Sequence, residues 1–290
     1  MAQANAVSNL IVPPEWESLA AQDMRGAVLL IGGTDSGKTS LASYLVQQWS
    51  ARSRSIALMD CDVGQGVLGL PATMTLRVFT GSTYTDYCFF VGAISPRGHM
   101  LRILVGVHTL YKKALSLGAE TVIVDSTGLV DPGQGGLALK SAKIDLLMPC
   151  HVITLARGAE LNPILTSWRN HPLVRITTLR ASPHARVRSR AERVAWRRER
   201  WEAYFRQAVP LTFPLQSIAA INWLLPTAQR ICAFVDAEGL CRGIGRVTYV
   251  ARGSSTITAE TPLRSLEGVV AIRFGAPRLE ERIMGNVEPK

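Results

Sequence analysis

A glycine-rich run of eight residues carries the clearest chemical signal in the chain. From Gly32 to Thr39 it reads G-G-T-D-S-G-K-T, which fits the pattern GxxxxGK[ST]. An apolar run at residues 27–31 precedes it and an amphipathic stretch follows it, so it joins a strand to a helix. Glycines let backbone N–H groups surround an anion, and the helix adds the positive end of its dipole. The pattern predicts a loop that binds the phosphates of a nucleotide.

Two side chains at the end of this loop have the chemistry that the phosphates require. Lys38 supplies a point charge to the β- and γ-phosphates, and the hydroxyl of Thr39 ligates Mg²⁺. We therefore expect a nucleotide and Mg²⁺ to bind here. The predicted nucleotide-binding residues are Gly33, Thr34, Asp35, Ser36, Gly37, Lys38, Thr39 and Ser40.

Carboxylates follow two other apolar runs. Asp60 and Asp62 come after residues 55–59, and Asp125 comes after the apolar run at residues 121–124. In a parallel sheet such positions face the ligand crevice. One carboxylate would hold the water shell of Mg²⁺, and another would take a proton from an attacking hydroxyl. The pattern alone does not choose between Asp60 with Asp62 and Asp125 for the metal.

The residues after Asp125 offer groups to a phosphate. In the sequence D-S-T-G, Thr127 has a hydroxyl and Gly128 has an unobstructed backbone N–H. Such a strand-end turn is also common without any function, because Asp and Gly favour turns.

Residues 186–206, here called the arginine segment, carry a one-sided charge. Eight of the 21 residues are arginine, against three glutamates. The composition favours a helix, and Ser182-Pro183 suits its start. Three interpretations remain open: a lid that closes over phosphates, a nucleic-acid clamp, or a solvated face. In a lid, we expect Arg190 and Arg200 at solvated positions. The aromatic residues Trp196, Trp201, Tyr204 and Phe205 indicate a docking stripe on this helix.

The elements that must position these groups alternate along the first 180 residues. Expected strands are residues 27–31, 55–59, 88–91, 121–124, 151–155 and 173–177, and expected helices are 38–48, 101–117 and 136–146. Strand–helix alternation predicts an α/β fold of the P-loop NTPase class, with a mostly parallel sheet flanked by helices. Short strands at 231–235, 240–250, 255–259 and 269–274 predict a small β-rich C-terminal domain. We expect a P-loop domain at residues 1–222, including the arginine segment, and the β-rich domain at 223–290.

Charge and composition restrict the class of protein. The 290 residues carry 32 basic and 22 acidic side chains, a net charge of +10, and 26 of the basic residues are arginine. Arginine binds phosphate through a planar fork, so the bias indicates an anionic partner. The sequence shows no apolar run of membrane-spanning length and no hydrophobic leader, and its five cysteines are widely spaced. We expect a cytoplasmic protein without a membrane partner.

Four motifs, in this order, resemble the polynucleotide 5′-hydroxyl kinases related to the kinase subunit of mRNA 3′-end cleavage factor and to the pre-ribosomal RNA-processing 5′-kinase. They are GGTDSGKTS, DCDVGQG, DSTGLV and the arginine lid RSRAERVAWRRERWEAYF, and the intervening VGAISPRGHM also matches. The match spans roughly residues 13–205, and the β-rich tail is similar to the end of short prokaryotic members. One departure is Leu129, where many members carry tryptophan.

The resemblance implies a role for each motif. Lys38 and Thr39 would bind the phosphates of ATP and Mg²⁺, and Asp62 would orient or deprotonate the RNA 5′-hydroxyl. The resemblance thus favours the D-C-D element over Asp125, with Asp60 in the outer shell of the metal. The implied catalytic residues are Lys38, Asp62, Arg188, Arg193 and Arg197, the acceptor-binding residues are Asp60, Gln65, Thr127 and Gly128, and the metal residues are Thr39 and Asp60.

The resulting expectation is an enzyme that transfers the γ-phosphoryl group of ATP to the 5′-hydroxyl of a polynucleotide, RNA before DNA. Its partners would be ATP and a polynucleotide with a 5′-hydroxyl end, and the sequence names no protein partner. The alternative is a P-loop NTPase that acts as a nucleic-acid-binding scaffold, GTPase or chaperone without kinase activity. A guanine-reading NKxD sequence, which a GTPase would need, is not found.

Overall fold

The computed structural model describes residues 12–52, 55–182, 185–222, 230–250, 256–276 and 283. The chain forms two compact units, each built from separate stretches of sequence. The first unit contains Met1–Asp62, Leu76–Asp86 and Leu110–Val187, and the second contains Val63–Thr75, Tyr87–Thr109 and Arg188–Lys290. None of the described helices is both long enough and apolar enough to cross a membrane.

A parallel sheet forms the centre of the first unit. Its strands are β1 (Gly26–Gly32), β2 (Ile56–Asp60), β5 (Thr121–Asp125), β6 (His151–Ala156) and β7 (Arg175–Arg180). They pair in the order β7-β6-β1-β5-β2. Residues of β1, β2, β5 and β6 are buried almost without exception, as expected for parallel strands covered on both faces. Because the strands are parallel, their carboxyl ends all lie at one edge.

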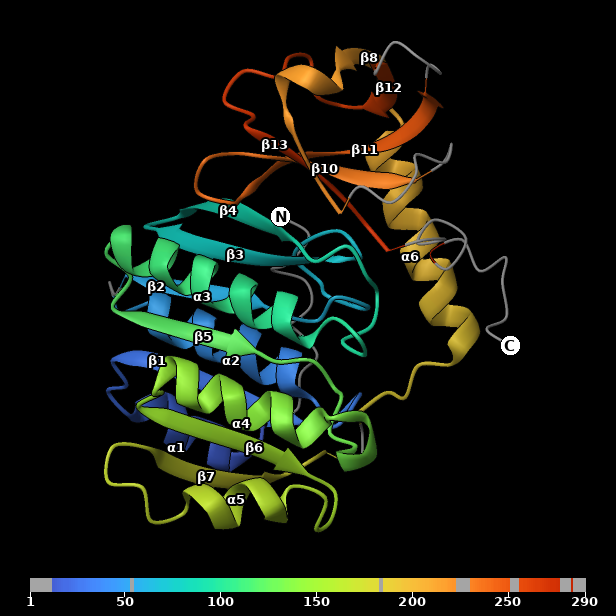
Figure 1. The fold of residues 1–290 in the computed structure, drawn as a ribbon. Coiled ribbons are helices and arrows are strands. Elements are labelled where there is room, and N and C mark those ends of the chain that lie inside the picture. The colour runs from blue at the N-terminus through green and yellow to red at the C-terminus, as the bar shows by residue number, and fades with distance from the viewer. Residues whose placement is uncertain are drawn as a thin grey trace. The chain divides into compact units, whose positions relative to one another are not determined.

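Helices cover both faces of this sheet. Figure 1 shows α4 (Gly136–Leu147) and α5 (Asn162–Trp168) on one face, and α1 (Pro14–Ala21) and α2 (Lys38–Ser50) on the other. A 3₁₀ turn, η2 (Pro132–Gln134), leads into α4. The strands predicted at residues 27–31, 55–59, 121–124 and 151–155 and the three predicted helices are present. The strand expected at 173–177 begins two residues later.

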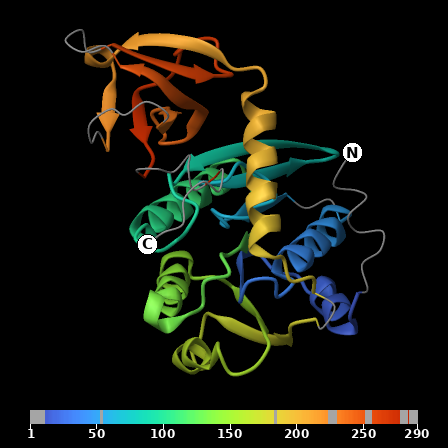
Figure 2. The same ribbon diagram turned by 90° about the vertical axis from the view of Figure 1, so that its right-hand side faces the viewer.

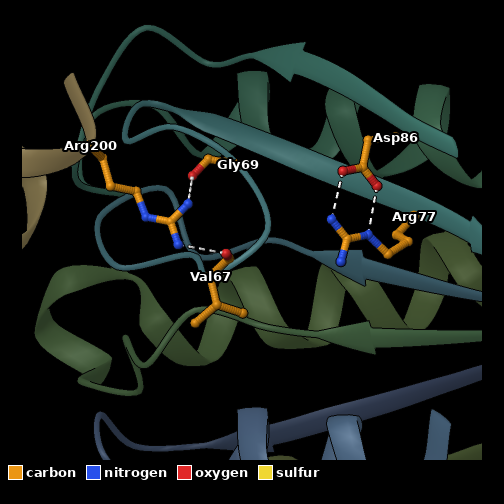
Figure 3. A network of polar contacts seen from close by, with 5 residues as sticks. All are labelled: Val67, Gly69, Arg77, Asp86 and Arg200. Atoms are coloured by element: carbon orange, nitrogen blue, oxygen red, sulfur yellow. Dashed lines mark hydrogen bonds and ion pairs between the residues drawn. The ribbon is translucent and has the colours of Figure 1, made fainter. Parts of the chain in front are cut away.

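Two strands and one helix are divided between the units: β3 (Thr73–Thr80), β4 (Thr83–Phe90) and α3 (Met100–Ser116). In the part that belongs to the first unit, Arg77 donates to both carboxylate oxygens of Asp86 at 2.7 Å each (Figure 3). Its guanidinium also lies 3.7 Å from the centre of the Tyr84 ring. The sequence predicted a strand only at residues 88–91. The missed part of β4 is mostly exposed, so it lacks the apolar run on which the prediction relied.

Antiparallel strands dominate the second unit. They are β8 (Val209–Pro214), β9 (Ala219–Ile221), β10 (Ile231–Val235), β11 (Cys241–Val250), β12 (Thr256–Thr261) and β13 (Ala271–Phe274), with a 3₁₀ turn η3 (Leu215–Ser217). β10 pairs with β11 and β13, and β12 pairs with β11 and β8. Four β-strands expected after residue 230 are therefore present.

The arginine segment forms the long helix α6 (Arg190–Phe205), seen along its length in Figure 2. Its N-cap is Ser189: the Ser189 hydroxyl accepts from the Glu192 N–H, and the Glu192 carboxylate accepts from the Ser189 N–H. This capping box satisfies two donors at the helix start. The helix begins later than the start expected at Ser182-Pro183, of which Pro183 lies outside the described residues, and Arg186 and Arg188 precede it.

The carboxyl-terminal half of α6 packs into the core of the second unit. Trp201 is 3% exposed and belongs to a cluster with strand residues such as Ala233 and Ile244. The hydroxyl of Tyr204 accepts from the Ile244 N–H at 2.8 Å. Trp201, Tyr204 and Phe205 of the aromatic stripe therefore form a docking face, whereas Trp196 lies against the Arg200 guanidinium. The division of the chain thus differs from the expected boundary at 222/223, because α6 belongs with the β-rich part. Residues 223–229, where that boundary was expected, lie outside the described residues.

Candidate active site

The glycine-rich loop leaves β1 at the carboxyl edge of the sheet and enters α2. Gly37 is the N-cap of α2 with φ of +96°, a conformation that favours glycine. Gly32 is required for a different reason: there is no space for a side chain, because a Cβ at this position would lie 2.6 Å from the Leu155 carbonyl oxygen. The loop therefore has the close-packed backbone that phosphate binding requires.

Lys38 is buried within this loop. It is 7% exposed, and its ammonium donates to the Gly33 carbonyl at 2.7 Å and to the Ser36 hydroxyl at 3.4 Å. Burial lowers the pKa of Lys38, and the negative charges of Asp125, Asp62 and Asp35 oppose that shift. Three carboxylates thus lie near the ammonium and partly offset the effect of burial on its pKa.

Thr39 binds the carboxylate at the end of β5. Its hydroxyl donates to Asp125 Oδ2 at 2.6 Å, while Asp125 Oδ1 is buried without a hydrogen-bond partner among the described residues. Burial raises the pKa of Asp125, with Asp62 adding to the rise and Lys38 and Thr39 opposing it. A hydroxyl and an unsatisfied buried carboxylate oxygen together form a pair of ligands that suits a hard cation.

The two carboxylates of the D-C-D element differ in exposure. Asp60 is paired in register with Asp125 on the neighbouring strand and is 4% exposed. Its Oδ1 accepts from the N–H of Asp62 at 3.0 Å, so it fixes the turn after β2. Asp62 is only half-buried. Of the three carboxylates at this edge, Asp62 is therefore the one that an incoming hydroxyl can reach.

The loop after β5 is held from two sides. Lys140 on α4 is fully buried, and its ammonium donates to the Thr127 carbonyl, to the Ser126 hydroxyl at 2.9 Å and to the Thr127 hydroxyl at 3.4 Å. The Ser126 hydroxyl donates in turn to the Leu30 carbonyl on β1 at 2.6 Å. On the other side, a Cβ at Gly128 would lie 2.6 Å from Thr34 Cα. Lys140 and the nucleotide loop thus fix residues 126–128.

The hydroxyl of Thr127 is less accessible to a phosphate than the sequence suggested. Thr127 is 2% exposed, whereas Gly128 is half-buried. Lys140 was not predicted. Lysines on the buried face of α4 were the available signal, but nothing in the sequence indicated that Lys140 would contact a loop thirteen to fourteen residues earlier.

The remaining predicted residues, Gln65, Arg188, Arg193 and Arg197, belong to the second unit. Gln65 joins the loop after the D-C-D element to the arginine segment. Its amide nitrogen donates to the Arg193 carbonyl at 3.4 Å, and Arg188 donates to its amide oxygen at 3.5 Å. Burial lowers the pKa of Arg197, and the charges of Arg193 and Arg190 lower it further. Positive charges are therefore concentrated along this face of α6.

Arg200 also contacts that loop. Figure 3 shows its guanidinium donating to the Val67 carbonyl at 2.8 Å and the Gly69 carbonyl at 3.2 Å. The sequence interpreted Arg200 as a solvated position, and this is wrong. The carbonyls of the loop replace water around its charge, so Arg200 ties α6 to the loop.

Comparison with known proteins places these observations in a family. Residues 32–207 match the family model described as "mRNA cleavage and polyadenylation factor CLP1 P-loop". A polyribonucleotide 5′-hydroxyl-kinase of Pyrococcus furiosus is 26% identical, and the match covers 88% of each chain. One from Methanocaldococcus jannaschii is 33% identical over 62% of this chain and 50% of its own length.

A solved structure agrees with the fold. The structure of a wild-type Clp1p–Pcf11p complex superposes with a TM-score of 0.67 at 12% identity, over 90% of this chain and 76% of that chain. The predicted α/β P-loop fold with additional C-terminal strands is confirmed. The chain belongs to the family of the mRNA cleavage and polyadenylation factor CLP1 P-loop.

Proposed function

We propose that this protein is an ATP-dependent kinase that transfers the γ-phosphoryl group to the 5′-hydroxyl of RNA. The observation that supports it best is the half-exposed Asp62 at the carboxyl edge that also holds Lys38 and Asp125. A nucleotide-binding loop beside an accessible carboxylate suits transfer to a hydroxyl. Relatives named as polyribonucleotide 5′-hydroxyl-kinases, which match along most of the chain, support the same activity.

Each residue of the edge has a task in this reaction. The loop N–H groups and Lys38 bind the phosphates, and the Lys38 charge stabilises the γ-phosphoryl group as it transfers. Asp62 accepts the proton of the attacking hydroxyl. Residues 126–128, fixed by Lys140, present the backbone N–H of Gly128 to the acceptor strand. Arg188, Arg193 and Arg197 supply further positive charge to the phosphates.

The residues present fit Mg²⁺. Thr39 and the unsatisfied oxygen of Asp125 would hold it, with Asp60 beside them at the same register position. When bound, Mg²⁺ would supply positive charge that neutralises the phosphate oxygens. This arrangement gives Asp125 a part that the resemblance assigned to Asp60.

The activity is tested by incubating the full chain with γ-labelled ATP and an oligoribonucleotide that has a 5′-hydroxyl. We expect label on the RNA and equimolar ADP. The same oligoribonucleotide with a 5′-phosphate is the control and should remain unlabelled. Release of labelled inorganic phosphate without labelled RNA would favour the alternative, a nucleotide-hydrolysing scaffold.

Replacing the half-buried Asp62 and the buried Asp125 one at a time separates the roles of these two carboxylates. Asp62→Asn keeps the shape but cannot accept a proton, so we expect kcat to fall about 10²-fold or more while ATP affinity is retained. Asp125→Asn removes a ligand of the cation, so it should raise the Mg²⁺ concentration needed for half-maximal rate and weaken ATP binding. Single-turnover rates measured across an Mg²⁺ titration distinguish the two. A larger loss of chemistry at saturating Mg²⁺ in Asp125→Asn would mean that Asp125 is the base.

Lys140 should affect the acceptor more than the nucleotide. In Lys140→Met the Thr127 carbonyl and Ser126 hydroxyl lose their donor, so we expect the KM for the oligoribonucleotide to rise about tenfold, with an unfolding penalty of about 1–3 kcal/mol. Lys143→Met is the matched control, because Lys143 is also fully buried but its ammonium has no hydrogen-bond partner among the described residues. We expect Lys143→Met to leave the KM for ATP and the KM for the oligoribonucleotide unchanged. Steady-state kinetics and thermal unfolding provide the measurements, and equal changes in the two variants would contradict the role of Lys140.

Acceptor binding should depend on salt. The groups available, namely the Gly128 backbone and several arginines, suit phosphates and not base edges. We expect the logarithm of affinity for single-stranded RNA to fall linearly with the logarithm of salt, by about 0.7 per neutralised phosphate. Fluorescence anisotropy with two oligoribonucleotides of unrelated sequence measures this. A flat salt response with a strong sequence preference would contradict it.

A further inference from the structure

Two cysteines of the second unit lie directly opposite each other on neighbouring strands. Cys88 on β4 and Cys241 at the start of β11 are register partners in an antiparallel pairing. Among the described residues, this is the one register pair that joins β4 to β11. They are two of five widely spaced cysteines in the chain, and the proposed reaction uses neither of them.

The pairing brings the sulfur atoms of Cys88 and Cys241 within reach of each other. Opposite residues of an antiparallel pair have Cα atoms about 4.5–5.5 Å apart, and their side chains project to the same face. A disulfide needs Cα atoms about 4.4–6.8 Å apart, so the backbone already has the required spacing. The two thiols are also hydrogen-bonded to each other. The sulfur atoms can therefore bond while β4 and β11 keep their pairing.

The backbone next to Cys241 is irregular, which gives the strand room to adjust. The pairing of β11 with β10 shifts its register directly after Cys241, between Phe234 and Val235 of β10. Arg242 is the extra residue of this β-bulge, and a bulge interrupts the ladder of hydrogen bonds. Within the bulge, the Cys241 thiol donates to the Gly243 carbonyl at 3.2 Å. A small shift of Cys241 toward β4 thus does not disturb a continuous ladder.

Access from solvent distinguishes these two cysteines from the other three. Cys88 and Cys241 are both half-buried, so a small reagent can reach them, whereas Cys61 and Cys232 are buried. Cys150 is half-buried too, but it belongs to the first unit. Accessibility and an opposed position therefore coincide at Cys88 and Cys241.

We propose that Cys88 and Cys241 form a site of reversible oxidation, where a small disulfide such as oxidised glutathione converts the two thiols into a bond between β4 and β11. The Cys88 thiolate attacks the reagent, forms a mixed disulfide and releases one glutathione thiol. The Cys241 thiolate then attacks the Cys88 sulfur and releases the second glutathione thiol. Two protein thiols are oxidised, the reagent is reduced to two thiols, and the two protons pass to glutathione.

The contact between the thiols sets the order of attack. The hydrogen bond with Cys88 and burial raise the pKa of Cys241, and the charge of Cys88 adds to the rise. Since the thiolate is the nucleophile, Cys88 attacks first. Once Cys88 carries glutathione, it has no charge to raise that pKa and Cys241 ionises more readily. The proposal does not depend on the proposed function.

Peptide mapping of the oxidised protein tests the site. The reduced full chain is incubated with oxidised glutathione and digested without reductant for mass spectrometry. We expect a cross-linked peptide pair that joins Cys88 to Cys241, and recovery of both thiols with dithiothreitol. Oxidation in guanidinium chloride should scatter the bonds among several cysteine pairs, because the strands no longer oppose these two residues. Stable glutathione adducts or unmodified thiols at Cys88 and Cys241 of the folded protein would overturn the proposal, as would the same preferred pair in the unfolded chain.

Single replacements test the order of attack. In Cys241→Ser the mixed disulfide cannot be resolved, so we expect glutathione to remain on Cys88. Cys150→Ser is the matched control, at the half-buried cysteine of the first unit, and should form the Cys88–Cys241 bond at the wild-type rate. An unmodified Cys88 in Cys241→Ser, or loss of the bond in Cys150→Ser, contradicts the proposed sequence of attack. The wild-type map needs no substitution, and none of these measurements needs ATP or RNA.

Discussion

Lys38→Ala is expected to reduce phosphoryl transfer by about 10³-fold or more, the largest effect of any single change in the loop. Lys38 is the one side-chain cation of the loop, and its ammonium already points along the loop toward the Gly33 carbonyl. Binding of a triphosphate would exchange that carbonyl for phosphate oxygens. Without Lys38, only the metal and the arginines would stabilise the negative charge that develops on the transferring phosphoryl group.

The control for this prediction must separate chemistry from folding, because Lys38 is 7% exposed and lies near three carboxylates. Its low exposure differs from the exposed position expected of a ligand-facing lysine, because the ammonium donates to the Gly33 carbonyl and the Ser36 hydroxyl of the loop. Lys143→Ala removes another buried lysine from the same unit and should retain transfer. Circular dichroism and single-turnover assays on both variants test this. Wild-type transfer by a folded Lys38→Ala protein would contradict the assignment of the loop.

The sequence predicted the site best where function depends on residues close together in the chain. The loop from Gly32 to Thr39 and the strand-end carboxylates follow from local pattern, because phosphate binding and parallel strands constrain consecutive residues. The contacts that join these pieces were not predictable in the same way. The bond between Thr39 and Asp125 links residues 86 positions apart, and only the pairing of β1 with β5 brings them together.

Lys140 and Arg157 show why part of the site was missed. Each contacts backbone carbonyls, which every residue possesses, so no particular residue type at the partner position signals the contact. Lys140 reaches Thr127 and Arg157 reaches Asp35 only because helix α4 and strand β6 lie beside β1 and its loop. Such contacts depend on tertiary packing, which periodicity and composition do not encode.

The arginine segment shows a different limit. Its helix was predicted from composition, but the start was misplaced, although the capping box from Ser189 to Glu192 was present in the sequence. A solvated Arg200 was the reasonable expectation for an arginine-rich helix. Its two carbonyl partners at Val67 and Gly69 come from a loop more than 130 residues earlier. Charged residues on a helix therefore give little information about which of them is tethered.

Arg193→Ala is expected to lower kcat by about 10³-fold or more, the scale of an arginine that stabilises a transferring phosphoryl group. Arg193 and Arg197 are one turn apart on α6, and both are half-buried. The pKa of Arg197 is lowered by burial and then by Arg193 and Arg190. Arginine binds phosphate through its planar fork, so a row of arginines along one face of the helix makes phosphate the expected ligand. Arg188 lies before the helix, and we expect a smaller loss from its removal.

The matched control for Arg193 is Arg198→Ala, at an exposed arginine on another side of α6. Arg200 cannot serve, because its removal would release the loop at Val67 and Gly69. Single-turnover transfer at saturating ATP and oligoribonucleotide measures the chemical step. Arg193→Lys should recover only part of the rate, since lysine keeps the charge but lacks the planar fork. If Arg193→Ala and Arg198→Ala transfer equally well, the segment acts as a general basic clamp. A loss of transfer rate in Arg193→Ala alone, with normal affinity for the oligoribonucleotide, means instead that the Arg193 charge acts on the phosphoryl group during its transfer.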